Sequence, residues 1–458
     1  MLFSRRDLTR IILPLIAQQV LSVTINMVDS MMVADAGEAA VSGISLVGSL
    51  DTLLILAFSS LATGGAVVVS QSIGKGDLDL SRSAAKQLLY AVTGIAFLVA
   101  APVLIFRKPL LGACFGSVEA DVMQNAQSYF FYIALSFPFL GFNDAAFALF
   151  RAMGNSMVSM TVSLIMNLIN VGGNALLIYG FGMGAAGAAI STLFSRFVGS
   201  VILFVLVHNK KNMIYVERIF HYRPDFAIIK QILRIGIPGG VENSMFQFGK
   251  LLTQSMISSL GTAAIAANAV ANTLANYQYM PGNAVGLATV TVVGRCIGAG
   301  ETKQAKKYAR ILLAICYGLL WLIVVLTVLL AKPVIGLYQL SDEAADLALR
   351  LILYHAACAA VIWPIAFMLP RVFRASGDVK FPLYVSTVCM WVFRVALGYL
   401  LVSEQIGMFG LTVPGLGMGA MGVWVAMTVD WVFRAVLFGV RFVSGKWLTK
   451  HKPVAKKA

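Results

Sequence analysis

A block of apolar sequence occurs twice in this chain, and the two copies lie 224 residues apart. The copies share glycines and prolines, residues that fix turns and helix bends. These residues are, in the first copy and then in the second, Pro14, Gly37, Gly74, Gly76, Pro109 and Gly112, and Pro238, Gly261, Gly298, Gly300, Pro333 and Gly336. Repeated hydrophobic halves are typical of secondary transporters, in which the binding site lies between the halves.

The composition indicates that lipid forms part of the solvent. Of the 458 residues, 59% are hydrophobic and 12% are charged, whereas soluble proteins carry about 25% charged residues. A helix that crosses a bilayer needs roughly 20 apolar residues. Stretches of this kind predict twelve spanning helices, near residues 8–34, 44–72, 85–106, 125–150, 157–180, 186–208, 228–258, 264–294, 308–331, 345–372, 380–402 and 419–443.

Six spans in each copy make the two copies enter the membrane from the same side, so a pseudo-two-fold axis along the membrane normal relates them. We therefore predict an all-α integral membrane fold with two six-helix lobes. The N-lobe is expected at 1–207 and the C-lobe at 228–443. Between them, 208–227 mixes basic and apolar residues and is interpreted as an amphipathic linker on the cytoplasmic leaflet. Residues 444–458 form a basic tail.

The net charge of +15 is distributed by topology. Of the 35 Lys and Arg residues, 27 fall on the termini and on the connections of the same side, and only Arg107, Lys108 and Lys332 fall on opposite connections. This bias follows the positive-inside rule, which places both termini in the cytoplasm of a cell whose plasma or inner membrane holds the chain. The charge pattern therefore excludes nucleic-acid binding as its explanation.

Enzyme chemistry finds no support in the sequence. Segments 182–187 and 417–422 match GxGxxG, but both fall in turns between membrane helices and not in the βαβ unit that a dinucleotide site requires. The chain contains no HExxH, GxxxxGK[ST] or GxSxG motif and only four histidines. We expect neither enzymatic activity nor a cofactor beyond a coupling ion.

Asp29 is the clearest candidate for chemistry inside the membrane. An ionisable side chain at this depth costs at least ~2.5–3.5 kcal/mol and is a functional candidate by default. Its counterpart in the second copy is Thr253, so the fold itself does not require the charge. Amides occur nearby on the same helical face and on one face of 157–180: Asn26, Asn167, Asn170 and Asn174.

If those faces meet, Asp29 becomes a carboxylate surrounded by amides. Such a cluster can take up a proton, because burial disfavours the charged carboxylate. It can also offer oxygen ligands to Na⁺, which makes Asp29 the one candidate metal ligand, or bind an organic cation. The alternative is that Asp29 forms a structural bridge between helices near the outer interface.

The second copy carries charges of its own. Glu242 and Lys250 lie eight residues apart on one stripe of 228–258, and Arg394 lies in the middle of 380–402. Lys250 and Arg394 can be substrate contacts or buried ion-pair partners. Asp430 and Arg434 are spaced i, i+4 and are expected to pair with each other.

A polar stripe follows helix 264–294, with Asn272, Asn276 and Tyr279 as candidate cavity residues. The same stripe can serve as interhelical glue. Pro14 and Pro238 interrupt the first helix of each copy. Because a proline frees a backbone carbonyl, each is a candidate switch between straight and bent helices.

These features together resemble the multidrug and toxic compound extrusion (MATE) transporters of prokaryotic type. The resemblance rests on the twin six-helix lobes, Pro14 with Asp29, the IGKGD and IGAGE loops, and the Arg-Ala-x-Gly turns at 151–154 and 374–377. It covers the chain from about Leu8 to Phe442.

The resemblance implies a V-shaped antiporter that expels cationic or amphiphilic drugs in exchange for H⁺ or Na⁺ by alternating access. It also implies that Asp29 is the cation site and that Asn170 assists it. Members often carry an aspartate where this chain has Asn174, so coupling in this lobe is expected to rest on Asp29 alone. Glu242 does not match the family's glutamate on the seventh helix, so the resemblance implies no role for it.

Two other functions remain to be weighed. A lipid-linked oligosaccharide flippase of the same superfamily would need a more cationic cavity, to which Lys250 and Arg394 could contribute. A non-transporting membrane scaffold would leave Asp29 without a purpose. The expected partners are a small-molecule drug and the lipid bilayer, with no nucleic acid, and the expected state is a monomer.

Overall fold

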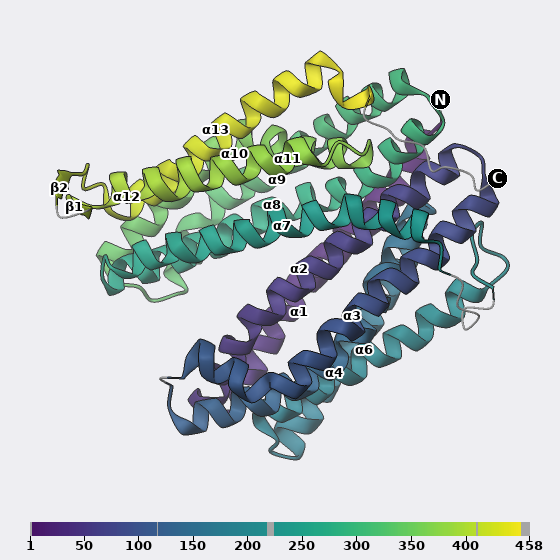
Figure 1. The fold of residues 1–458 in the computed structure, drawn as a ribbon. Coiled ribbons are helices and arrows are strands. Elements are labelled where there is room, and N and C mark those ends of the chain that lie inside the picture. Colours follow the sequence, from purple (N-terminus) through teal and green to yellow (C-terminus); the bar gives the residue numbers. More distant parts are fainter. Residues whose placement is uncertain (1, 117, 218–223, 409–410, 450–458) are drawn as a thin grey trace. The chain divides into compact units, whose positions relative to one another are not determined.

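The computed structural model describes residues 2–116, 118–217, 224–408 and 411–449. These residues are almost entirely helical (Figure 1). The elements of the first copy are α1 (Arg5–Ala34), α2 (Glu38–Gly74), α3 (Leu78–Phe115), α4 (Ala120–Ala152), α5 (Ser156–Asn174), the π-helical segment η1 (Ala175–Gly180) and α6 (Gly184–His208). Those of the second copy are α7 (Phe226–Ser258), α8 (Thr262–Gly298), α9 (Thr302–Gly336), α10 (Asp342–Ala375), α11 (Lys380–Cys389), the π-helical segment η2 (Met390–Ala396), α12 (Leu397–Val402), β1 (Gln405–Met408), β2 (Leu411–Pro414), α13 (Gly419–Ser444) and the 3₁₀ turn η3 (Lys446–Thr449).

The prediction of twelve spanning segments is confirmed, since α5 continues into η1 and α11 continues through η2 into α12. Ten of the described helices are long and apolar enough to cross a membrane. The other two, α7 and α8, have 33 and 37 residues, long enough to span, and they carry polar residues such as Glu242, Lys250 and Asn272. The chain is therefore a multi-pass membrane protein.

The recurring glycines mark turns that require a left-handed backbone. Gly76 and its counterpart Gly300 have φ angles of +77° and +74°, and both directly follow a long helix. Gly154 and Gly377 form a second matched pair, with φ angles of +77° and +86°. Glycine adopts these angles without the steric cost that a Cβ imposes. The repeat is therefore visible in the sequence because each copy needs the same tight turns.

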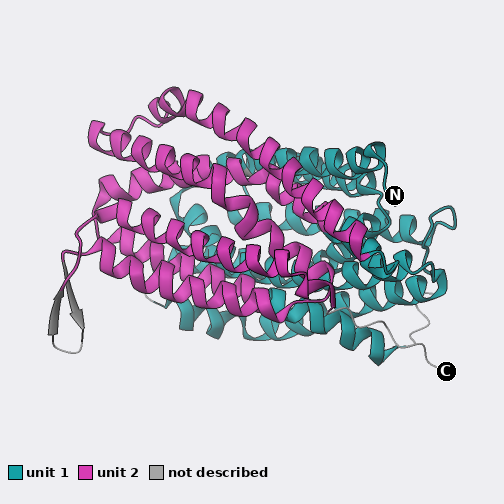
Figure 2. Ribbon diagram, turned by 90° about the horizontal axis from the view of Figure 1, so that it is seen from above, with its two compact units in different colours: residues 1–240, 290–301, 453–458 teal, residues 241–289, 302–452 magenta. Residues whose placement is uncertain are grey.

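The chain divides into two compact units, which Figure 2 colours teal and magenta. Unit 1 contains Met1–Gly240 and Val290–Glu301, and unit 2 contains Val241–Thr289 and Thr302–Lys452. The start of α7 and the end of α8 thus belong to unit 1. Within unit 1, α4 packs against α2, α3 and α6, and within unit 2, α10 packs against α9 and α13.

The ends of α2 and α8 cross within unit 1 through repeat-related glycines. A Cβ on Gly74 would overlap the backbone of Arg295, and a Cβ on Gly298 would overlap the backbone of Gln71. Because Gln71 and Arg295 also lie 224 residues apart, the contact is the same in both directions. This reciprocity is what a two-fold repeat produces, and it explains why both crossing positions are glycine.

Both copies contain a π-helical segment in the fifth helix, η1 in the first copy and η2 in the second. A π segment inserts a wider turn into an α-helix and often occurs at functional sites. Asn174 directly precedes η1, and Arg394 lies inside η2. The backbone irregularity therefore coincides with candidate residues in each copy.

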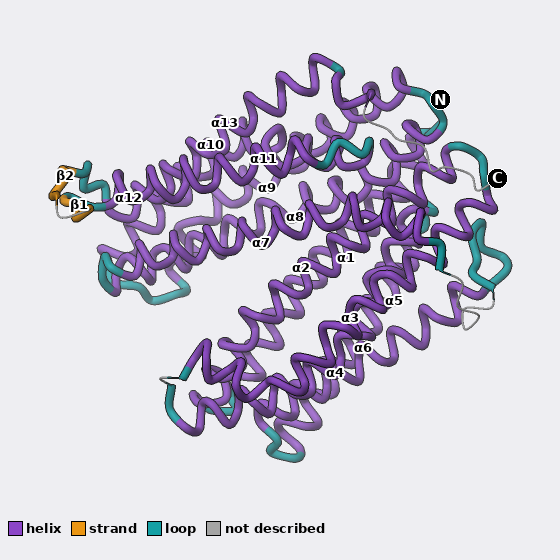
Figure 3. The backbone as a smooth tube through the Cα atoms, viewed as in Figure 1, coloured by secondary structure: helices purple, strands orange, loops and turns teal. Residues whose placement is uncertain are grey.

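The connection before α13 contains an antiparallel hairpin, drawn in orange in Figure 3, in which Met408 pairs with Leu411 and Gln405 with Pro414. In the predicted linker, residues 209–217 form turns, with Ile214 and Val216 buried. Residues 218–223 of the linker and 450–458 of the tail lie outside the described residues.

Candidate functional site

Asp29 lies half-buried on α1 and faces the end of α5. The side-chain amide of Asn174 donates a hydrogen bond to Asp29 Oδ1 at 3.0 Å. Both residues belong to unit 1, and the i, i+4 spacing of Asn170 and Asn174 places the two amides on one face of α5. The structure thus brings together the carboxylate and the amides of that helix.

Asn170 completes this cluster when its NH₂ group points toward Asp29. In this orientation Nδ2 lies 2.9 Å from Asp29 Oδ2 and 3.1 Å from Oδ1. Its oxygen then accepts hydrogen bonds from the backbone N–H of Thr192 at 3.3 Å and from its hydroxyl at 3.2 Å. The hydrogen-bond network assigns the orientation of an amide, and this orientation satisfies both ends of the Asn170 side chain.

The Asp29 carboxylate receives amide hydrogen bonds but no balancing positive charge. No salt bridge in the described part of the chain involves Asp29. Apolar packing lies nearby, because Met32, Ile178 and Ala188 form a buried cluster between α1, η1 and α6. A carboxylate in apolar surroundings without a cationic partner gains from binding a proton or a metal cation.

One oxygen in the cluster also lacks a partner. Asn174 Oδ1 is buried and accepts no hydrogen bond from any described residue. An unsatisfied buried acceptor is rare and calls for an explanation. The Nδ2 group of the same amide contacts Asp29, so rotation of the amide would turn this oxygen toward the carboxylate as a second ligand for a small hard cation.

Two other amides predicted for this site stand differently. Asn167 is half-buried on α5 and makes no side-chain hydrogen bond to another described residue. It lies two turns before Asn174, or roughly 10 Å along the helix axis. Asn167 is therefore on the same face of α5 as Asn174 but at a different height along the helix. Asn26 lies on α1, but its side chain is outside the described part of the structure.

The sequence reasoning missed two carboxylates in unit 1. Asp51 on α2 lies 3.5 Å from the guanidinium of Arg196, which also donates to Ser136 Oγ at 2.7 Å. Asp144 lies on α4, and its Oδ2 is buried without a hydrogen-bond partner among the described residues. The rule that selected Asp29, an isolated carboxylate in an apolar helix, would have selected both.

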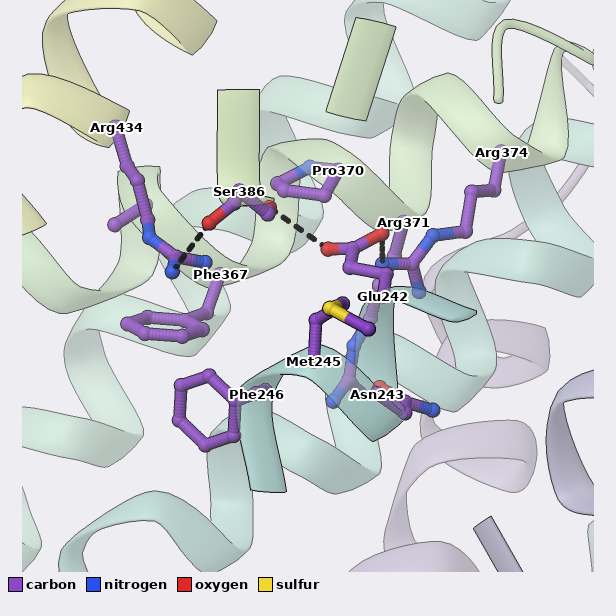
Figure 4. A pocket seen from close by; sticks show the side chains of 11 residues that line it. Glu242, Asn243, Met245, Phe246, Phe367, Pro370, Arg371, Arg374, Ser386 and Arg434 are labelled. Atoms are coloured by element: carbon purple, nitrogen blue, oxygen red, sulfur yellow. Dashed lines mark hydrogen bonds and ion pairs between the residues drawn. The ribbon is translucent and has the colours of Figure 1, made fainter. Parts of the chain in front are cut away.

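In unit 2, Glu242 lines a cavity of about 150 Å³. Its Oε2 accepts a hydrogen bond from Arg374 at 2.8 Å and its Oε1 accepts one from Ser386 Oγ at 2.8 Å (Figure 4). Arg371 also lines the cavity and donates to the backbone and side-chain oxygens of Asn283 at 2.8 and 2.7 Å. Glu242 is therefore held in an ion pair.

Unit 2 also contains a buried carboxylate that two arginines share. Asp430 is fully buried, with Arg434 Nε at 2.6 Å and Arg394 Nε at 3.3 Å from its oxygens. The predicted i, i+4 pair of Asp430 and Arg434 is confirmed. Arg394 is an ion-pair partner as well, but one carboxylate cannot neutralise two guanidinium groups.

Arg394 and Lys250 also line one small cavity, together with Asn272. The remaining candidates in unit 2 lie elsewhere. Asn276 is exposed, and Tyr279 hydrogen-bonds His355 and stacks on Trp363 with ring centroids 5.1 Å apart. Tyr279 thus belongs to an aromatic cluster.

Pro14 and Pro238 lie inside α1 and α7, and both helices continue through them. Their role as switches remains a prediction. Among the described residues, no group of three or more His, Cys, Asp or Glu side chains is placed to hold a metal ion. A site at Asp29 would have to use amide and backbone oxygens.

Comparison with known proteins identifies the family. The family model described as MatE matches residues 14–176 and again residues 238–400, which are the two copies of the repeat. The chain belongs to the MatE family. The predicted resemblance is thereby confirmed, and membership in this family of transporters gives the chain a transport role.

Relatives of this MatE chain match along nearly its whole length. The "Uncharacterized transporter YisQ" of Bacillus subtilis is 26% identical over 92% of this chain and 90% of its own. The "Probable multidrug resistance protein NorM" of Thermotoga maritima is 24% identical over 97% of this chain and 93% of its own.

Solved structures share the fold. One is described as the outward-facing conformation of a multidrug resistance MATE family transporter of the MOP superfamily, with a TM-score of 0.84 at 18% identity over 96% of this chain and 94% of that chain. Another, described as "Reverse polarity of binding pocket suggests different function of a MOP superfamily transporter from Pyrococcus furiosus", has the same score, identity and coverage.

Proposed function

We propose that this protein is a multidrug efflux antiporter, which exports organic cations or amphiphilic drugs in exchange for H⁺ or Na⁺ by alternating access. The observation that carries the proposal is Asp29, a membrane-embedded carboxylate held by two amides with no cationic partner among the described residues. Family membership and relatives named as multidrug resistance proteins support the transport of drugs.

Asp29 couples the two solutes because its charge changes what the site can bind. The ionised carboxylate attracts a cation, and an added proton or Na⁺ removes that attraction. A ligand shifts the balance between two conformations only by its difference in affinity for them. Competition between the ion and the drug for one negative charge makes the binding of one favour the release of the other.

The neighbours of Asp29 are compatible with either ion. A proton on Asp29 needs an acceptor nearby, and Na⁺ needs several oxygens. The unpartnered Asn174 Oδ1 can serve in both cases. We propose that the coupling ion binds between this oxygen and the Asp29 carboxylate, with no further cofactor.

The setting of this antiporter follows from its sequence. We propose that it acts as a monomer in the plasma or inner membrane with both termini in the cytoplasm, because basic residues concentrate on the connections of that side. Export then moves the drug from the basic side to the opposite side.

A lipid-linked oligosaccharide flippase is the second candidate. It is favoured by the arginines that line the Glu242 cavity in Figure 4 and by the Lys250 and Arg394 cavity. Such a substrate carries a phosphate-linked headgroup, which cationic side chains would hold.

Transport by proteoliposomes tests the proposal. A fluorescent cationic dye would be followed under an imposed pH gradient and then under a Na⁺ gradient, with wild type, Asp29→Asn and the exposed control Asp121→Asn. We expect one gradient to drive dye movement in wild type and the control, and none in Asp29→Asn. Equal movement in all three proteins would remove Asp29 from the mechanism. No movement under either gradient would favour the lipid-linked substrate.

A further inference from the structure

A second polar cavity, of about 60 Å³, lies in unit 2 between α7, α8, η2 and α13. Among the described residues its charged lining is cationic, since Lys250 and Arg394 line it and no carboxylate does. Its polar lining also includes Gln254, Asn268, Asn272 and Trp424. A cavity with two positive charges and no negative one is unsuited to an organic cation.

Described residues outside the cavity lining do not fully neutralise the positive charge of this cavity. Arg394 is only 5% exposed, and its single carboxylate partner, Asp430, is shared with Arg434. Arg394 Nε lies 3.3 Å from Asp430 but makes no well-formed hydrogen bond with a described residue. Lys250 forms no salt bridge in the described part of the chain. Lys250 is exposed, so Arg394 is the buried cation of the cavity without full compensation, and an anion beside it would relieve that cost.

The amides of the cavity are arranged to leave a donor for such an anion. Asn268 donates to Gln254 Oε1 at 3.1 Å and accepts from Trp424 Nε1 at 3.0 Å. Asn272 donates to the backbone oxygen of Asn268 at 2.9 Å. Because the oxygen of Gln254 is engaged, its NH₂ group remains as a donor at the exposed edge of the cavity, near Lys250.

We propose that this cavity binds the acidic group of a small amphiphilic solute, a carboxylate held between Lys250 and Arg394. Charge-assisted hydrogen bonds from an ammonium and a guanidinium group are the strong ones for a carboxylate. The volume suits such a group and is far below the roughly 300 Å³ at which pockets for whole drugs begin. Apolar neighbours of the cavity, Ile257, Val423 and Met427, would contact the carbon skeleton. The proposal rests on the proposed function only in taking the solute to be a transported compound.

The repeat strengthens this assignment. Thr253, which also lines the cavity, corresponds to Asp29, and Lys250 corresponds to Asn26, each 224 residues earlier. The negative charge of the first copy thus lies three residues beyond the position that corresponds to the positive charge of the second copy.

A pair of dyes that differ in one carboxylate tests the proposal. Rhodamine 110 has a free carboxylate, and rhodamine 123 is its methyl ester. Binding of each to the purified full-length protein in detergent would be measured by fluorescence polarisation, with a detergent blank. We expect Lys250→Gln to weaken rhodamine 110 binding by about tenfold and to leave rhodamine 123 binding within about twofold. Lys250→Arg, which keeps the charge, should restore rhodamine 110 binding.

Lys230→Gln is the matched control, because Lys230 is an exposed lysine on the same helix and lies outside the cavity lining. Equal losses for both dyes, or no loss of rhodamine 110 in Lys250→Gln, would overturn the proposal. Displacement of rhodamine 110 by a short-chain phosphatidic acid but not by inorganic phosphate or acetate would make a lipid headgroup the occupant and overturn the small-solute assignment. Binding in detergent requires no ion gradient, so this result is independent of the transport assay.

Discussion

Asp29 and Lys250 lie three residues apart in repeat register, on the first helix of each copy, yet the two sites carry opposite charge. Asp29 faces the amides of α5 in unit 1. Lys250 shares a cavity with Arg394 of η2 in unit 2. In both units the facing residue comes from the fifth helix of its copy, next to or within a π-helical segment.

This difference shows which features of the repeat are structural. The turn and crossing glycines recur because both copies need the same backbone, as the reciprocal contact of Gly74 and Gly298 demonstrates. The side chains at the sites do not recur, so the fold does not dictate them. The membrane-embedded charges therefore carry chemistry that is specific to each unit.

The largest effect is expected from the buried cluster of unit 2. Asp430→Asn leaves Arg394 and Arg434 without their shared carboxylate, which should destabilise the protein by about 3–5 kcal/mol. Asp346→Asn, in the exposed pair with Arg350, should change little. Both variants would be heated in steps, and the folded protein that remains would be measured by fluorescence-detected size-exclusion chromatography. A variant Asp430→Asn as stable as wild type would show that the cluster does not hold unit 2 together, and would weaken the contrast with Asp29.

Substitutions of the two crossing glycines, one on α2 and one on α8, should reduce stability equally. Gly74→Ala and Gly298→Ala each place a Cβ against the opposing backbone, and each should cost about 1–3 kcal/mol. The controls are Gly94→Ala and Gly318→Ala, a repeat-related pair with open space around both positions. The same unfolding assay applies. A large loss at one crossing glycine and none at the other would contradict the reciprocal contact.

A smaller effect, confined to ion coupling, is expected at the amide that contacts Asp29. Asn174→Ala removes a 3.0 Å hydrogen bond to the carboxylate and the unpartnered oxygen beside it. Hydrogen bonds to charged groups contribute about 1.5–3 kcal/mol, so the ion concentration for half-maximal dye transport should change by about tenfold or more. An unchanged ion dependence would exclude Asn174 from the ion site.

The smallest effect is expected at Asn167. Asn167→Ala should leave ion-driven transport within about twofold of wild type, because its side chain contacts neither Asp29 nor another polar group among the described residues. The measurement is the initial rate of dye transport in proteoliposomes. A loss as large as that of Asn174→Ala would extend the Asp29 site along α5 and contradict its structural limits.

The sequence predicts the helices well because each span is a long apolar segment bounded by glycine turns. The spacing also places Asn170 and Asn174 on one face of α5, whereas the contact of that face with Asp29 comes from the structure. The sequence cannot predict depth, and so Asn167 was grouped with a site two turns away. The π segments η1 and η2 were not predicted, because a widened turn leaves no distinct signal in an apolar run.

Pairing between distant helices was also beyond the sequence. Nothing in the local pattern shows that Arg196 meets Asp51 or that Arg394 joins Asp430. Such pairs depend on which helices are neighbours and on their rotation, which packing of small residues determines. The opposite charge of the two sites became visible only when these partners were known.

Ion release on dye binding tests the central claim most directly, because it reads the chemistry of Asp29 without transport. Rhodamine 123 would be added to the purified protein in weakly buffered detergent, with a pH indicator for proton release and, in a second sample, radioactive Na⁺ for displacement. We predict release of one of these ions by wild type and by Lys250→Gln, and none by Asp29→Asn. Release that survives in Asp29→Asn, or that is lost in Lys250→Gln, would contradict the assignment of the cation site to unit 1.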